Sequence, residues 1–153
     1  MTEQRVLGPR LFTLQEAEAQ LPVVKKRLAR FQDFFARYEA VKRDLSVLRL
    51  VSCSGGAEKN PDQEALDEKE GRLKVLLGEM EAIQQDLLNA GCVPKSIQEG
   101  LVDFFALKDD RLVFLCWKQG EDRITAWHTL EGGFAGRMPI ETFREDDGES
   151  KRV

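Results

Sequence analysis

The chain has 153 residues, of which 42% are apolar and 33% are charged, and this balance is typical of one globular domain. Its net charge of −4 does not favour a basic protein that binds nucleic acid. The chain has one histidine and three cysteines, and it contains no C-x-x-C or H-x-x-x-H pair. These are too few ligands for a zinc site built mostly from Cys and His.

An odd cysteine count favours a reducing compartment. Residues 1–10 contain no apolar run like that of a signal peptide, and no stretch of the sequence is apolar for long enough to cross a membrane. We therefore expect a cytoplasmic protein that contacts neither membrane nor nucleic acid.

A long first helix is predicted from the capping box that Thr13 and Glu16 form. Apolar residues then recur at alternating steps of three and four up to about residue 50, which is the spacing of a coiled coil. Pro22 lies inside this pattern, so we expect a short helix over about residues 14–20, a kink or break, and then the long helix.

A second helix is predicted from Pro61 to Gly91, with acidic residues in its first turns and a glycine suited to its end. Residues 1–52 hold 10 basic and 6 acidic residues, net +4, whereas residues 53–91 hold 4 and 9, net −5. The two helices therefore attract each other. We predict a long antiparallel helical hairpin over about residues 13–91.

Beyond residue 100 the hydrophobic pattern changes to that of strands. Three antiparallel strands are predicted, at residues 101–107, 111–117 and 123–130. A tight turn at Asp109–Asp110 joins the first two, and a looser turn of four residues at 119–122 joins the last two. The predicted fold is α+β: the hairpin, kinked at Pro22, followed by this meander and a glycine-rich loop.

The two turns set a register that pairs Asp103 with Cys116 and Cys116 with Thr125. In this register His128 lies on the face opposite Asp103. Both faces are largely apolar, so we expect the second face to meet another subunit. We predict a homo-oligomer, a dimer, formed through this face or through the hairpin.

The domain organisation is predicted to be simple. We expect a single domain over residues 1–143, with the hairpin at about 13–91 and the meander and loop at about 100–140. The charged residues 144–153 are expected to form a flexible tail.

Two features of the C-terminal part could carry chemistry. His128, the one histidine, could be a general base, a metal ligand or a proton-linked contact, or it could be a partly buried residue with a backbone partner. The glycine-rich segment Gly132–Arg137 could bind an anion through converging N–H groups and the fork of Arg137, or it could be a structural turn.

A third feature is a set of acidic residues that could complete a mixed metal site with His128. They are Asp103, Glu121, Asp122 and Glu131. The predicted register separates Asp103 from His128, so we expect no metal and no cofactor, and His128 and Glu131 are the residues best suited to a metal. We expect Cys116 to be a small buried residue rather than a nucleophile, because no cationic neighbour would lower its pKa.

The beginning and the C-terminal block resemble a bacterial family. The motifs are LFTLQEA at 11–17 with Leu21–Pro22, GLVDFF at 100–105, LCW at 115–117, Gly120–Glu121, Trp127–His128 and GFAGRMPI at 133–140. Over about residues 10–140 the chain resembles domain-of-unknown-function family 2203, some members of which are labelled division initiation protein. The family supplies no catalytic residue. The resemblance implies the fold and a candidate ligand-binding cluster: Glu121, Trp127, His128, Gly136 and Arg137.

Two functions follow from these observations. We expect a non-enzymatic assembly or protein-interaction module in which the hairpin and the second sheet face bind partner subunits. The alternative is a small anionic-ligand or metal-binding protein, or a weak enzyme, with a site around His128 and the Gly133–Arg137 loop. An enzyme is the less favoured of these alternatives.

Overall fold

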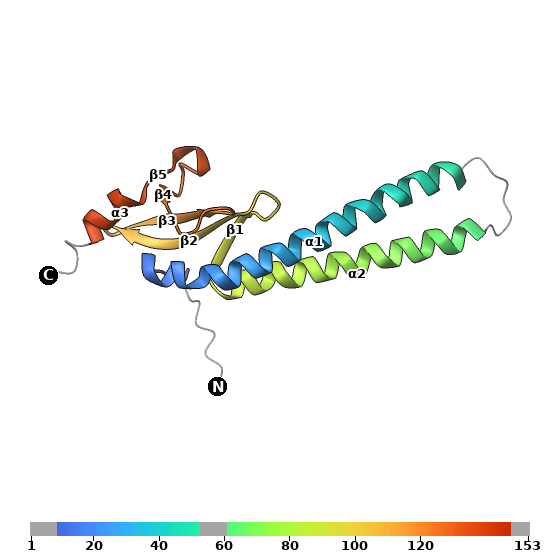
Figure 1. The fold of residues 1–153 in the computed structure, drawn as a ribbon, viewed down its shortest axis with the longest axis horizontal. Coiled ribbons are helices and arrows are strands. Elements are labelled where there is room, and N and C mark those ends of the chain that lie inside the picture. Colours follow the sequence, from blue (N-terminus) through green and yellow to red (C-terminus); the bar gives the residue numbers. More distant parts are fainter. Residues whose placement is uncertain (1–8, 53–60, 148–153) are drawn as a thin grey trace, which may run out of the picture. The chain divides into compact units, whose positions relative to one another are not determined.

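The computed structural model describes residues 9–52 and 61–147 (Figure 1). The two helices of the first part are followed by short strands and a last helix. In chain order these elements are α1 (Leu14–Ser52), α2 (Pro61–Asn89), β1 (Cys92–Ser96), β2 (Leu101–Lys108), β3 (Arg111–Lys118), β4 (Ala126–Thr129), the 3₁₀ turn η1 (Phe134–Gly136), β5 (Met138–Pro139) and α3 (Ile140–Asp147). The mixed helix and sheet class is confirmed, but the sheet has five antiparallel strands in the order β1-β2-β3-β4-β5 rather than three.

Helix α1 begins at the predicted capping box. The Glu16 N–H donates to the Thr13 hydroxyl, and the Thr13 N–H donates back to the Glu16 carboxylate. The helix runs from Leu14 to Ser52 through Pro22, so the expected break after a short helix at about residues 14–20 is wrong, and the kink stays a prediction. One buried apolar stripe continues in phase on both sides of the proline, and its packing keeps the helix continuous; the stripe is Ala17, Leu21, Val24 and Leu28.

The chain forms two compact units. We call residues 9–28 and 86–147 the sheet unit, and residues 29–52 and 61–85 the helical unit. The single domain expected over residues 1–143 stays a prediction. The predicted connection at 53–60 lies outside the described residues.

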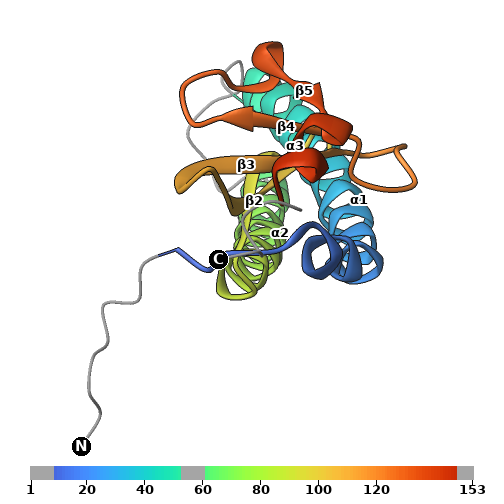
Figure 2. The ribbon, with the colours of Figure 1, turned by 90° about the vertical axis from the view of Figure 1, so that its left-hand side faces the viewer.

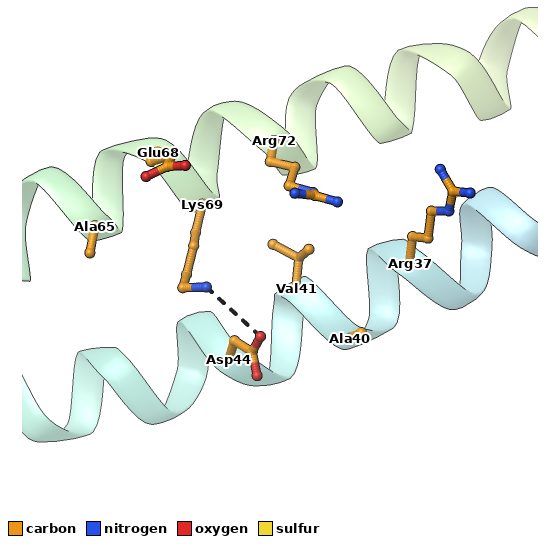
Figure 3. A pocket seen from close by; sticks show the side chains of 8 residues that line it. All are labelled: Arg37, Ala40, Val41, Asp44, Ala65, Glu68, Lys69 and Arg72. Atoms are coloured by element: carbon orange, nitrogen blue, oxygen red, sulfur yellow. Dashed lines mark ion pairs between the residues drawn. The ribbon is translucent and has the colours of Figure 1, made fainter.

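In the helical unit, ion pairs join α1 to α2. Arg49 lies 2.8 Å from Glu70, and Lys69 reaches across to Asp44 at 3.8 Å (Figure 3). A cavity of about 480 Å³ lies between the two helices at this point. The ion pairs agree with the charge difference between the two helices. The antiparallel coiled-coil hairpin itself stays a prediction.

In the sheet unit, the turn between β2 and β3 is as predicted. Asp109 and Asp110 both have positive φ angles, 51° and 62°, which is the backbone of the tight hairpin turn that matches the twist of antiparallel strands. The turn pairs Lys108 with Arg111, and the register runs from there to the predicted pair of Asp103 with Cys116.

The predicted register between β3 and β4 is wrong by one residue. Cys116 pairs with Ala126 rather than Thr125, and Phe114 pairs with His128. A shift of one residue turns every side chain of a strand to the other face. His128 therefore shares a face with Asp103 and Cys116, and Trp127 lies on the opposite one.

The cause of this shift is the way Glu121 holds the connection between β3 and β4. The Lys118 N–H donates to the Glu121 carboxylate, and the Trp117 indole N–H donates to the Glu121 carbonyl. The hydroxyl of Thr125 also donates to that carboxylate, so Thr125 belongs to the connection and β4 begins at Ala126. A four-residue turn does not describe this longer loop.

The two faces of the sheet carry different side chains. Phe104 lies on one face, where the ring of Phe12 packs edge-on against it at a centroid distance of 5.2 Å, and the Phe12 N–H donates to the Phe105 carbonyl. Asp103, Phe114, Cys116 and His128 define the opposite face, which we call the His128 face. The order of β2, β3 and β4 can be followed in Figure 2.

Helix α3 packs on the sheet through Ile140 and Phe143, which are both buried. It continues to Asp147, so it includes the start of the tail expected at residues 144–153, and residues 148–153 lie outside the described residues. None of the described helices is long and apolar enough to cross a membrane.

Candidate functional site

Three side chains of the His128 face meet from three neighbouring strands. Asp103 on β2 and Cys116 on β3 are direct partners in the register, and His128 comes from β4. The His128 Nε2 atom lies 3.0 Å from the Asp103 Oδ2 atom, and one ligand atom from each of the three residues lies within 4.8 Å of the others. All three residues are at most 2% exposed.

This arrangement corrects the expectation that Asp103 and His128 lie on opposite faces. The correction follows from the one-residue register shift between β3 and β4. The sequence therefore identifies each of the three residues but does not predict that they meet on one face. Within the described residues, no other group of three His, Cys, Asp or Glu side chains converges in this way.

The hydrogen bonds fix where the protons of the His128 imidazole lie. A backbone carbonyl can only accept, so the Nδ1 atom, 2.8 Å from the Thr129 carbonyl, carries a proton. A hydrogen bond between Nε2 and Asp103 Oδ2 then requires one further proton between these two atoms. The pair is either imidazole with a carboxylic acid or imidazolium with a carboxylate, and its net charge is zero in both cases.

Burial raises the pKa of the Asp103 carboxyl, and the charges of His128 and Lys95 and the Cys116 thiol partly oppose that rise. Burial, and then the neighbouring Asp103, raise the pKa of the Cys116 thiol to about 12. The thiol is therefore protonated at neutral pH. The burial of Cys116 is as expected, but Arg137 is a cationic neighbour that partly lowers this pKa, contrary to the premise of the sequence argument.

One atom of this cluster is left without a partner. The weak S–H donor of Cys116 lies beside the carboxyl, but no donor in the described part of the chain has hydrogen-bond geometry to Asp103 Oδ1. Leaving a buried carboxyl oxygen unsatisfied costs roughly 1–3 kcal/mol. Native proteins carry few such atoms, and each calls for a ligand, an ion, a water molecule or a functional reason.

A cavity of about 140 Å³ opens beside these side chains. The chain around it comes from β1, β2, β3, β4 and the glycine-rich loop. Its lining residues are Lys95, Leu101, Asp103, Cys116, His128, Leu130, Gly133 and Phe134. The Lys95 ammonium lies 4.2 Å from the centre of the Phe114 ring, so a cation stands near the cavity on the β1 side.

Two of the sequence candidates, Glu121 and Arg137, bind each other. The Arg137 Nη2 atom lies 2.9 Å and 3.1 Å from the two carboxylate oxygens of Glu121 and also donates to the Cys116 carbonyl. Burial tends to raise the pKa of Glu121, but hydrogen bonds from Thr125, Lys118 and Arg137 together hold that pKa below its ordinary value. Arg137 does not line the cavity; its Nη2 atom is engaged by the chain itself, whereas its buried Nε atom has no hydrogen-bond partner within the described residues.

The glycine-rich loop uses several of its own N–H groups. Gly132 donates to the Thr129 hydroxyl, Gly136 donates to the carbonyls of Gly132 and Gly133, and Arg137 donates to the Phe134 carbonyl. These N–H groups are directed at atoms of the loop rather than outward. The loop contributes Phe134 to the cavity instead.

The remaining candidates lie elsewhere. Trp127 is on the face opposite His128, where its indole N–H donates to the Thr142 hydroxyl at 2.8 Å and Lys108 lies 5.2 Å from its ring. Glu131 is exposed and takes no part in the cluster of His128. The structure therefore brings together Glu121 with Arg137, and His128 with Asp103 and Cys116.

The fold and the site define a class of small α+β protein with a long helix, a second helix, an antiparallel sheet of five strands and a buried Asp-Cys-His cluster beside a cavity. The family model for uncharacterized conserved proteins DUF2203 matches residues 10–140. The chain belongs to this family, as the resemblance of its motifs indicates. No curated protein and no solved structure matches the chain.

Proposed function

We propose that the protein is a binding protein for a small ligand, which it holds in the cavity of the His128 face. The observation that carries this proposal is the Asp103 Oδ1 atom, a buried acceptor that lacks a hydrogen-bond partner within the described residues and belongs to a side chain that lines the cavity. A ligand that donates to this oxygen, or coordinates it, removes the penalty of leaving it unsatisfied.

The cavity limits the size of this ligand. Its volume of about 140 Å³ is close to the roughly 150 Å³ of a cavity that holds benzene or xenon. The ligand therefore has only a few non-hydrogen atoms, or it is an ion with its remaining water. Lys95 beside the cavity favours a ligand that carries a negative group at that end.

The same geometry supports binding rather than catalysis by these residues alone. The thiol of Cys116 is held in its protonated form. Both nitrogens of His128 are engaged, one with Thr129 and the other with Asp103, and neither bonds the thiol. The cluster lacks the contact between nucleophile and base that covalent catalysis requires.

The experiment is native mass spectrometry of the full chain, isolated from cells without a chelator. We expect a mass above that of the polypeptide in the wild type. Leu101→Trp should abolish the added mass, because Leu101 is 9% exposed and its larger replacement fills the cavity. Leu107→Trp is the matched control, since Leu107 lies on the same strand and is 47% exposed.

An added mass that survives Leu101→Trp contradicts the cavity as its site. The polypeptide mass alone in the wild type contradicts the proposal itself.

A second candidate is the assembly module, in which the helical unit pairs with a second copy of the chain. Large apolar side chains of this unit face solvent: Val47 is 61% exposed, Leu50 is 75% exposed and Val75 is 65% exposed. Exposed apolar side chains mark an interaction surface where they adjoin one another, and this supports the candidate. Analytical ultracentrifugation at micromolar concentration should show a dimer that Leu50→Glu weakens, and a wild-type monomer contradicts this candidate.

A further inference from the structure

We infer that Asp103, Cys116 and His128 form a site for one divalent transition-metal ion of the zinc class, at the inner end of the cavity. This inference rests on the proposed function and names its ligand. The sequence argues against zinc because it lacks paired Cys and His motifs, but three strands supply one ligand each. A site assembled by strand register leaves no spacing motif along the chain.

The distances in the cluster suit such an ion. Zinc bound tetrahedrally, with bonds of about 2.0–2.1 Å to nitrogen and oxygen, places those two atoms roughly 3.3 Å apart. His128 Nε2 and Asp103 Oδ2 are 3.0 Å apart, and the atom that Cys116 offers lies within 4.8 Å of both. Rotation of the Cys116 side chain that moves its sulfur by about one ångström therefore brings the sulfur within bonding distance of the ion, about 2.3 Å.

The histidine is already held in the orientation of a metal ligand. Its Nδ1–H donates to the Thr129 carbonyl at 2.8 Å. Metal-bound histidines almost always donate their second ring N–H to a carbonyl or carboxylate, which fixes the ring and directs the other nitrogen at the metal. Here that other nitrogen, Nε2, is the one that faces Asp103, and both side chains line the cavity.

The ligand set also balances the charge of the ion. A Cys116 thiolate, an Asp103 carboxylate and a neutral His128 together carry a charge of −2, which a divalent cation neutralises in this buried place. The proton on the thiol and the proton shared by Asp103 and His128 leave as the ion enters. Sulfur and nitrogen ligands select zinc-class ions over calcium and magnesium, which prefer oxygen.

The unpartnered Asp103 Oδ1 atom is an independent observation that points to the same ligand. The Asp103 side chain is 1% exposed, and its Oδ1 atom has no hydrogen-bond partner within the described residues, so this oxygen is free to coordinate a cation beside Oδ2 or in its place. With three protein ligands, the fourth position of the ion opens to the cavity. Water or a small anion near Lys95 can occupy that position.

The test is a titration of the chelator-treated full chain with Co²⁺, followed by optical absorption, and with Zn²⁺, followed by calorimetry. We expect one ion per chain, the visible bands of tetrahedral cobalt and a near-ultraviolet band from sulfur to cobalt. Cys116→Ser should remove the sulfur band, and His128→Gln and Asp103→Asn should weaken binding by more than about 100-fold.

Cys92→Ser is the matched control, because Cys92 is also a buried free cysteine of the sheet and lies outside the cluster. This variant should keep the sulfur band, and Glu131→Gln should keep the affinity. Asp103→Asn preserves the shape of the side chain, so its circular dichroism should match the wild type and separate loss of binding from loss of fold.

Failure of the wild type to bind Co²⁺ and Zn²⁺ overturns the inference, and so does a sulfur band that survives Cys116→Ser. If the metal ions do not bind but native mass spectrometry shows an organic mass that Leu101→Trp abolishes, the inference fails and the proposed function stands. If neither a metal ion nor any other mass is bound, both fail.

Discussion

The sheet unit and the helical unit differ in what they bury. The sheet unit encloses large side chains completely, such as Phe104 and Trp117, and with them the polar pair Asp103 and His128. The helical unit buries a smaller set: Val41, Leu45, Leu76, Met80 and Ile83. The difference teaches that only the sheet unit provides the dry, closely packed surroundings in which a polar cluster can bind a ligand selectively.

The largest expected effect distinguishes the two cores. Phe104→Ala removes a fully buried ring that contacts Phe12, and we expect it to lower the free energy of unfolding by about 3–5 kcal/mol. Leu45→Ala in the helical unit should cost only about 2 kcal/mol, at the low end of the range for such changes. Urea unfolding followed by circular dichroism measures both, and equal losses contradict the comparison.

The next effect concerns the connection that sets the register of β4. Glu121→Ala removes the acceptor of the Lys118 N–H, the Thr125 hydroxyl and the Arg137 guanidinium, so we expect a loss of about 2 kcal/mol. Glu121→Gln keeps the shape and removes the charge, so it should cost only about 1 kcal/mol because the pair is partly exposed. Urea unfolding gives both values, and a neutral Glu121→Ala contradicts the role of this residue.

The Glu121 carboxylate also predicts a pH dependence. Its pKa in the folded chain lies below the ordinary value. The carboxylate therefore contributes its full share to the free energy of unfolding above the ordinary pKa of a glutamate. That stabilisation is lost as the pH falls through the lower pKa of the folded state. The stability difference between the wild type and Glu121→Gln should shrink on acidification, and a difference that grows in acid has the wrong sign.

Two glycines should respond with opposite signs. Gly100 in the sheet unit has a φ of +74°, and a Cβ there would lie 2.4 Å from the Gln119 Cβ, so Gly100→Ala should cost about 1–2 kcal/mol. Gly71 in α2 has open space around it, so Gly71→Ala should stabilise by about 0.5–1 kcal/mol. Thermal unfolding shows whether each variant raises or lowers the unfolding temperature. A lower unfolding temperature for Gly71→Ala contradicts the open space around Gly71 and indicates that another molecule packs there.

The smallest effect belongs to the ion pairs of the helical unit. Arg49 and Glu70 are 58% and 46% exposed, so Arg49→Ala should change the free energy of unfolding by less than about 0.5 kcal/mol. A double-mutant cycle with Glu70→Ala isolates the pair. A coupling above about 1 kcal/mol contradicts its solvent-exposed character.

Local chemistry made part of this fold predictable. The capping box of Thr13 and Glu16, the turn at Asp109–Asp110 and the pairing of Asp103 with Cys116 all depend on residues close together in sequence. The register of β4 depends instead on how the Glu121 side chain bonds Lys118, Thr125 and Arg137. Hydrophobic periodicity and turn length carry no information about such side-chain bonds.

The candidate site was partly predictable for the same reason. His128 is identifiable as the one histidine, and Asp103 and Cys116 as a carboxyl and a thiol on paired strands. The one-residue error between β3 and β4 put His128 on the wrong face and so hid the cluster. Strands β1 and β5 were missed because β1 contains a proline and β5 has only two residues, so neither shows the pattern of a strand.

The most direct test of the central claim is zinc K-edge X-ray absorption of the zinc-loaded chain. We predict a first shell with one sulfur at about 2.3 Å and nitrogen or oxygen ligands at about 2.0–2.1 Å, in a total of four. Zinc that is lost on desalting, or a shell of oxygen and nitrogen without sulfur, contradicts the site formed by Asp103, Cys116 and His128.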